Sequence, residues 1–206
     1  MGREAEALGW EVISVDIRAD FQPTILCDLL EFDYKAAWKP GEFLWVHASP
    51  PCTLYSIASN HRNPEKANKL TERTKEILDY LNAPYITVEN PASSQMWLQG
   101  IFDYPKTLAS YCKYTDPGDE TWGYKKATIF CTTVPNLRLQ ICLKDCANMV
   151  VFEGRKLHKE CAQRGGSSST PKDSGIQKKR HTQTELYRIP GALCREIVLA
   201  IEADMK

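Results

Sequence analysis

The chain has 206 residues, of which 43% are hydrophobic and 25% are charged, and this size and composition suit one soluble α/β domain with a small appendage. No apolar run approaches the ~20 residues of a membrane helix, and the acidic segment 1–6 lacks the apolar core of a secretory signal, so we expect an intracellular protein, in cytoplasm or nucleus, with no membrane partner. The formal net charge of zero excludes nucleic-acid binding through whole-molecule charge, so any such surface has to be local.

Short apolar runs bounded by acidic residues, proline or glycine predict five strands, the first of them after a helix over residues 3–8 that stops at Gly9. The predicted strands cover residues 11–15, 25–27, 43–48, 85–88 and 128–131. A helix is predicted over residues 65–81, because its apolar side chains fall on one helical face: Ala67, Leu70, Ile77, Leu78 and Leu81. Strands that alternate with helices predict an α/β fold with a doubly wound, mostly parallel sheet.

The regular pattern ends near Thr133, and the residues after it predict a small insertion. Residues 134–182 contain a Cys/His-bearing stretch, the loop-forming run 165–171 and the basic run 177–181. Residues 183–206 close the chain with an apolar-periodic segment, helical after Pro190, that we expect to pack back on the sheet. The chain is thus predicted to comprise an α/β domain over residues 1–133, this insertion and a C-terminal helix.

Carboxylates follow the first two predicted strands. Asp16 comes directly after the first strand and Asp28 directly after the second. Ligands of open α/β sheets bind beyond the carboxyl ends of the strands, where a carboxylate can accept hydrogen bonds from a ribose. Either aspartate is equally well explained as the N-cap of a helix.

A thiol and a second acid follow the third and fourth strands. The third strand leads into Pro50-Pro51-Cys52, where two prolines make a stiff loop that presents the thiol at the sheet edge. The fourth leads into Glu89-Asn90 at the same edge. A thiol of lowered pKa is a nucleophile, and a buried acid can donate to a ring nitrogen. A structural cysteine buried in the core is the alternative for Cys52.

Pro50-Pro51-Cys52 and Glu89-Asn90-Pro91, about one helix apart, resemble the catalytic loops of the cytosine-5 DNA methyltransferases. The resemblance covers most of the chain in the same order: residues 10–16 resemble the second cofactor strand, residues 122–128 an aromatic-Gly-aromatic-basic segment, and residues 187–197 the closing helix. It implies the Rossmann-like fold of class I methyltransferases, S-adenosylmethionine as cofactor and DNA as partner, in a protein that we expect to be a monomer. One RNA-modifying branch shares these motifs.

The resemblance also implies the cofactor residues. Asp16 matches the acid that holds the ribose of S-adenosylmethionine, and Asp28 matches the residue that meets the adenine amino group. Ile17, Leu29 and Pro50 complete the expected cofactor site.

For catalysis, the resemblance implies that Cys52 adds to carbon 6 of a cytosine flipped out of the duplex. Glu89 contacts nitrogen 3 of that base, and Asn90 belongs to the same catalytic motif. The expected substrate-binding residues are Pro51, Ser56, Lys125 and Lys126.

The chain departs from the family pattern in its first and basic motifs. No glycine-rich cofactor loop precedes the first helix, so we expect an N-terminally truncated copy, and two lysines replace the usual Gln-x-Arg-x-Arg segment. The missing loop is equally compatible with a catalytically inactive methyltransferase-like module that binds nucleic acid or a partner. An amino-group methyltransferase also carries a Pro-Pro motif, but usually with an aromatic residue where Cys52 stands. An unrelated α/β domain is the remaining alternative.

The insertion has a metal-ligand pattern of its own. Cys142-x3-Cys146 and His158-x2-Cys161 supply four soft ligands in two close pairs, spacings compatible with a structural zinc site. Such a quartet also arises by chance in a chain with eight cysteines. The following residues 162–166 resemble compact inserts of short phage and virus methyltransferase-like proteins, so we expect a phage or virus origin.

Overall fold

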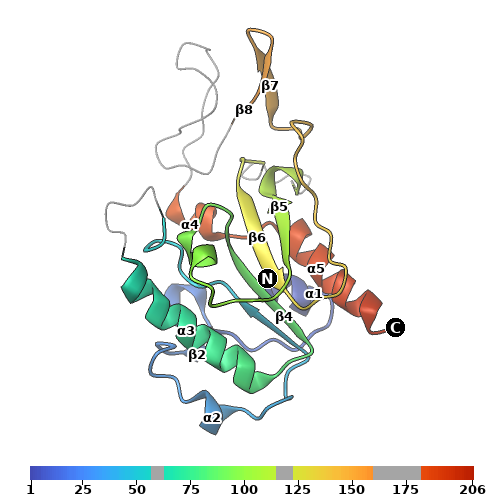
Figure 1. Ribbon diagram of the computed structural model, residues 1–206. Helices are drawn as coiled ribbons and strands as arrows, with labels where there is room; N and C mark the ends of the chain where they lie inside the picture. The colour runs from blue at the N-terminus through green and yellow to red at the C-terminus, as the bar shows by residue number, and fades with distance from the viewer. Residues whose placement is uncertain (57–62, 115–122, 160–181) are drawn as a thin grey trace.

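The computed structural model describes residues 1–56, 63–114, 123–159 and 182–206 and is built around a four-stranded sheet (Figure 1). The strand order is β3 (Trp45–Ala48), β4 (Tyr85–Pro91), β6 (Ala127–Thr132) and β5 (Lys106–Ser110). β3 and β4 are parallel, whereas β6 is antiparallel to both β4 and β5. The sheet is therefore mixed, and the mostly parallel, doubly wound sheet expected from the sequence is not confirmed.

The change of strand direction follows from the connections. An 18-residue helix, α3 (Pro64–Leu81), links β3 to β4 and supplies the crossover that parallel neighbours need. Between β4 and β6 the described residues form β5 and two short 3-10 helices, η2 (Gln95–Leu98) and η3 (Tyr111–Lys113), but no long helix. β5 and β6 therefore pair antiparallel, which needs no crossover helix.

Helices cover the two faces of this sheet. α3 begins after Asn63, whose side chain accepts a hydrogen bond from the Lys66 amide, and it packs on the face that carries Ile86 and Val88. α5 (Gly191–Asp204) packs with α1 (Gly2–Ala7) on the opposite face, against Phe130. The helices predicted over residues 3–8, over 65–81 and after Pro190 are confirmed.

The N-terminal strands form a separate parallel pair, β1 (Val15–Asp16) with β2 (Ile25–Leu26). They are shorter than predicted, because regular pairing is limited to these two residues of each strand. The 3-10 helix η1 (Ala19–Phe21) lies between them, and α2 (Tyr34–Ala37) follows. Val15 and Ile25 pack on the part of α3 that contains Ile77 and Leu81, so this pair stands beside α3.

Beyond the sheet, β7 (Met149–Phe152) and β8 (Arg155–His158) form a hairpin that projects from the domain (Figure 1). α4 (Gln183–Tyr187) begins with a capping box formed by Thr182 and Glu185. The loop predicted over 165–171 and the basic run 177–181 lie outside the described residues. None of the described helices combines the length and apolarity that crossing a membrane requires.

Candidate functional site

The two predicted catalytic motifs meet at one edge of the sheet. β3 and β4 run parallel with Ala48 opposite Val88, so the residues that follow β3 lie beside the end of β4. β4 is longer than predicted and includes the motif itself, since Glu89 and Asn90 pair with β6 instead of following the strand. The Asn90 side-chain amide donates a 2.7 Å hydrogen bond to the carbonyl oxygen of Pro50, which joins the two motifs directly.

Glu89 is buried and accepts hydrogen bonds, although it is a charged residue type. Its side chain is buried, 6% exposed. The phenol of Tyr111 donates to its Oε1 atom at 3.1 Å, and the hydroxyl of Thr128 lies 2.5 Å from the same atom. Burial is the main cause that raises the pKa of Tyr111 well above its usual value, and the charge of Glu89 raises it further. The phenol therefore keeps its proton and remains a hydrogen-bond donor. Both contacts are to Oε1, and Oε2 has no hydrogen-bond partner among the described residues.

Cys52 is half-buried in the loop after β3, and its ionisation depends on two charged neighbours. Burial is the largest effect and raises the pKa of the Cys52 thiol. The positive charge of Lys126 lowers this pKa, and the negative charge of Glu89 raises it. The charges of Lys126 and Glu89 therefore both act on the Cys52 thiol at this edge of the sheet.

The predicted substrate-binding residues differ in their surroundings. Lys126 is half-buried: its Nζ donates to the carbonyl oxygen of Leu186 at 3.0 Å and lies 4.5 Å from the centre of the Tyr111 ring. Lys125, its neighbour in sequence, is exposed. Pro51 is exposed beside Cys52, and Ser56 is half-buried at the end of a described segment. The structure thus brings Lys126, and not Lys125, into contact with the Cys52 environment.

A cavity of about 990 Å³ lies beside these motifs and is lined by every residue predicted to bind the cofactor: Asp16, Ile17, Asp28, Leu29 and Pro50. The Arg18 amide donates to Asp16 Oδ1 at 2.8 Å, and the Leu30 amide donates to Asp28 Oδ1 at 2.9 Å. The two aspartates therefore stabilise turns through one oxygen each, and neither of them is the N-cap of a helix. Their Oδ2 atoms accept no hydrogen bond from the described residues, so each carboxylate can still accept a hydrogen bond from a ligand.

Two residues that the sequence did not single out shape this cavity. Arg73 of α3 donates to the carbonyl oxygens of Leu29 (3.2 Å) and Phe32 (2.8 Å) and so fixes the loop that carries Asp28. His47 of β3 lines the cavity between Ser49 and Thr87, with ring nitrogens 3.0 Å and 2.8 Å from their hydroxyls. Burial is the main cause that lowers the pKa of His47 to about 3, and the positive charge of the N-terminus lowers it further. The imidazole of His47 is therefore uncharged at neutral pH.

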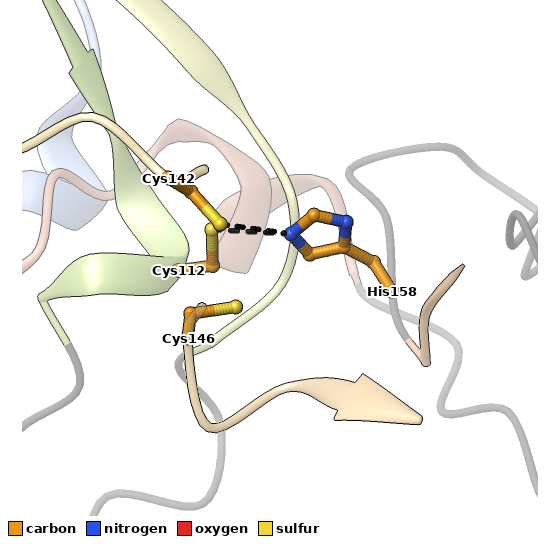
Figure 2. A group of neighbouring side chains, drawn as sticks. All are labelled: Cys112, Cys142, Cys146 and His158. Atoms are coloured by element: carbon orange, nitrogen blue, oxygen red, sulfur yellow. Dashed lines mark hydrogen bonds between the residues drawn. The ribbon is translucent and has the colours of Figure 1, made fainter. Parts of the chain in front are cut away.

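A second group of reactive side chains lies at the base of the β7–β8 hairpin (Figure 2). Cys112, Cys142, Cys146 and His158 each offer one ligand atom, and these atoms all lie within 4.8 Å of one another. Three of the four residues match the metal site predicted from the sequence. Cys161, the fourth predicted ligand, lies outside the described residues, and the structure brings Cys112 to the group.

Comparison with known proteins identifies the family. No protein-family model matches the chain. A probable DNA (cytosine-5)-methyltransferase of Frog virus 3 (isolate Goorha) is 30% identical over 212 aligned positions, which cover 94% of this chain and 91% of the viral protein. The chain therefore belongs to the DNA (cytosine-5)-methyltransferase family, as its resemblance in sequence predicted.

Proposed function

We propose that this enzyme transfers a methyl group from S-adenosylmethionine to carbon 5 of cytosine in DNA, through a covalent adduct with Cys52. The observation that carries the proposal is the hydrogen bond from Asn90 to Pro50. It joins the loop of Cys52 to the strand of Glu89, and Pro50 itself lines the cavity of Asp16 and Asp28. A methyl donor in that cavity and a base held between Cys52 and Glu89 would share one wall.

The cavity fits the proposed cofactor in size and in chemistry. Its volume of about 990 Å³ is at the upper end of the range of ligand pockets, ~300–1,000 Å³. Asp16 and Asp28 offer carboxylate oxygens to hydroxyl and amino groups, and Leu29 and Leu30 supply apolar surface for a purine ring. S-adenosylmethionine bound here would supply an electrophilic methyl group. Affinity for it is expected to fall at least tenfold in Asp16→Ala, measured by calorimetric titration.

The chemistry at the sheet edge follows from the two motifs. The cytosine has to leave the base stack, because carbon 5 is out of reach inside the duplex. The Cys52 thiolate adds to carbon 6 while Glu89 stabilises the ring by a hydrogen bond at nitrogen 3, which makes carbon 5 nucleophilic. After methylation, loss of the carbon 5 proton expels Cys52 and restores the aromatic ring. Lys126 favours the thiolate form of Cys52 throughout.

The direct test is formation of 5-methylcytosine. Purified protein is incubated with unmethylated DNA and S-adenosylmethionine, and the nucleosides are analysed by mass spectrometry. We expect 5-methylcytosine with the natural chain and none with Cys52→Ser, whose thermal unfolding should be unchanged. Methylation of an adenine or cytosine amino group would contradict the proposal, and so would equal turnover by Cys52→Ser. The same assay with RNA in place of DNA determines which nucleic acid is the substrate.

A further inference from the structure

We propose that Cys112, Cys142, Cys146 and His158 bind one structural zinc ion that attaches the β7–β8 hairpin to the end of β5. The inference concerns the fold of this part of the chain and does not depend on the proposed methyl transfer. It also changes the ligand set expected from sequence, since Cys112 replaces Cys161.

The arrangement of the ligand atoms suits a tetrahedral ion. Cys112 Sγ and Cys142 Sγ lie 3.6 Å and 3.3 Å from His158 Nε2, and all four ligand atoms lie within 4.8 Å of one another. Zinc–sulfur and zinc–nitrogen bonds of tetrahedral sites place neighbouring ligand atoms roughly 3.5–3.8 Å apart. In Figure 2 the three sulfur atoms and the imidazole nitrogen converge on one point. Three cysteines and one histidine form a closed ligand set of the kind found in structural zinc sites.

Two of the ligands are positioned by contacts that need no metal. The backbone pairs the end of β5 with the Cys142 segment, since the Ser110 amide donates to Gln140 O at 2.9 Å and the Cys142 amide donates to Ser110 Oγ at 3.1 Å. Lys113, directly after Cys112, forms a 2.9 Å salt bridge with Asp145. Cys112 and Cys142, thirty residues apart in sequence, are therefore held side by side by the fold itself.

The other two residues lie in the hairpin, which contains His158, and in the segment that leads into it, which contains Cys146. His158 lies opposite Met149 in the β7–β8 pair, and the Met149 amide donates to Cys146 O at 3.2 Å. His158 is buried, 6% exposed, whereas Val151 of the same hairpin is 70% exposed. The hairpin thus has little apolar core of its own, and an isolated two-stranded hairpin is marginally stable. A metal ion that crosslinks it to Cys112 supplies the missing stabilisation.

This site also lies next to the Glu89 environment. Cys112 follows Tyr111 in η3, and Tyr111 is the residue that donates to Glu89. A metal bound to Cys112 would hold η3 against the 140–146 segment and so limit the movement of Tyr111. The ion would act here as a structural element only, because all four of its tetrahedral positions are occupied by protein ligands.

The test is the metal content of the full chain expressed in zinc-supplemented medium, measured by plasma mass spectrometry. We expect about one zinc ion per chain, less than one tenth of this in Cys112→Ser and Cys142→Ser, and full content in Cys161→Ser. Cys131→Ser is the matched control, because Cys131 is buried like Cys112 but lies outside the group. Full zinc content in Cys112→Ser with loss in Cys161→Ser would overturn the proposed ligand set.

A second measurement covers the case in which a variant does not fold. The natural chain is stripped of zinc under reducing conditions and titrated with Co²⁺. We expect saturation at one equivalent, with the intense near-ultraviolet absorption of thiolate-to-cobalt charge transfer and the visible bands of a tetrahedral ion. No zinc in the purified chain together with no such spectrum, or a Cys112–Cys142 disulfide under these conditions, would overturn the proposal.

Discussion

The side-chain amide of Asn90 donates a 2.7 Å hydrogen bond to the carbonyl oxygen of Pro50, across 40 residues of sequence. Asn90 is almost completely buried, and its Oδ1 atom has no hydrogen-bond partner among the described residues. The amide therefore acts mainly as a donor to the loop of Cys52. This contact links the loop of Cys52 to the strand that carries Glu89, the residue directly before Asn90.

Loss of this contact should impair methyl transfer more than it impairs folding. Asn90→Ala removes one buried hydrogen bond, so we expect a loss of about 1–2 kcal/mol in unfolding free energy and a fall in kcat of at least tenfold. Thr132→Val is the control, since Thr132 is buried and its hydroxyl donates a hydrogen bond to the carbonyl oxygen of Ile86, away from this loop. Unfolding curves and single-turnover rates check both variants. An unchanged kcat in Asn90→Ala would show that the Cys52 loop is positioned by other contacts.

Tyr111 should act on catalysis through Glu89. Tyr111→Phe keeps the ring under Lys126 and removes only the hydroxyl that donates to Glu89. We expect kcat to fall roughly tenfold, the equivalent of one hydrogen bond of about 1.4 kcal/mol, with KM for DNA nearly unchanged. Tyr85→Phe is the matched control. This variant also loses one hydrogen bond from a phenol, to Asp204, but at the end of β4 that lies away from Glu89. Equal kcat in both variants would remove Tyr111 from the catalytic arrangement.

The charges around Cys52 predict opposite shifts in its ionisation. The Glu89 carboxylate raises the pKa of Cys52 and Lys126 lowers it. Glu89→Gln should therefore lower this pKa and move the pH profile of Cys52 alkylation to lower pH, although methyl transfer is severely slowed. Lys126→Met should move the profile to higher pH. Lys125→Met should leave it in place, since Lys125 is exposed and does not contribute to this pKa.

Peptide mass spectrometry after brief iodoacetamide labelling follows Cys52 separately from the other thiols. A shift in the same direction for Glu89→Gln and Lys126→Met would contradict the arrangement of charges described here. Unchanged profiles in both variants would contradict it as well.

The wall of the cavity that contains Asp16 and Asp28 should depend on Arg73. Its guanidinium donates to two carbonyl oxygens of the loop that follows Asp28. Arg73→Met should cost about 2 kcal/mol of unfolding free energy and weaken binding of S-adenosylmethionine. Lys75→Met, on the same helix, removes a salt bridge to the exposed Asp79 and should cost less than about 1 kcal/mol. Equal cofactor affinity in both variants would show that the loop keeps its position without Arg73.

The hydrophobic pattern of the sequence predicted the longer helices and the central strands of the fold. The helix over 65–81 was predictable to within one residue, since its apolar period spans several turns and Asn63 caps it. β3 and β4 were predictable from apolar runs in a central position. β5, with the sequence Lys-Thr-Leu-Ala-Ser, has no such run, and the hairpin β7–β8 buries too little to show one. Their pairing is fixed by tertiary contacts, and so is the antiparallel direction of β6.

The residues of the candidate site also fall into those that local sequence pattern predicts and those that only tertiary contacts reveal. Cys52 and Glu89 stand in motifs at strand ends, where sequence order alone indicates proximity. Tyr111 and Arg73 reach their partners through contacts between distant segments and carry no local signal. Cys112 was missed as a member of the Cys/His group because spacing rules consider close pairs, and it lies thirty residues before Cys142. A search for any cysteine near the end of a strand would have included it.

The central claim, a covalent bond between Cys52 and cytosine, is tested most directly by trapping. The protein is incubated with S-adenosylmethionine and a duplex in which cytosine is replaced by 5-fluorocytosine, whose carbon 5 has no proton to lose. The account predicts a denaturation-resistant complex that requires S-adenosylmethionine, with the modified base mapped to the Cys52 peptide, and none with Cys52→Ser. An adduct at another cysteine, or 5-methylcytosine formation in normal DNA without any trapped complex, would contradict it.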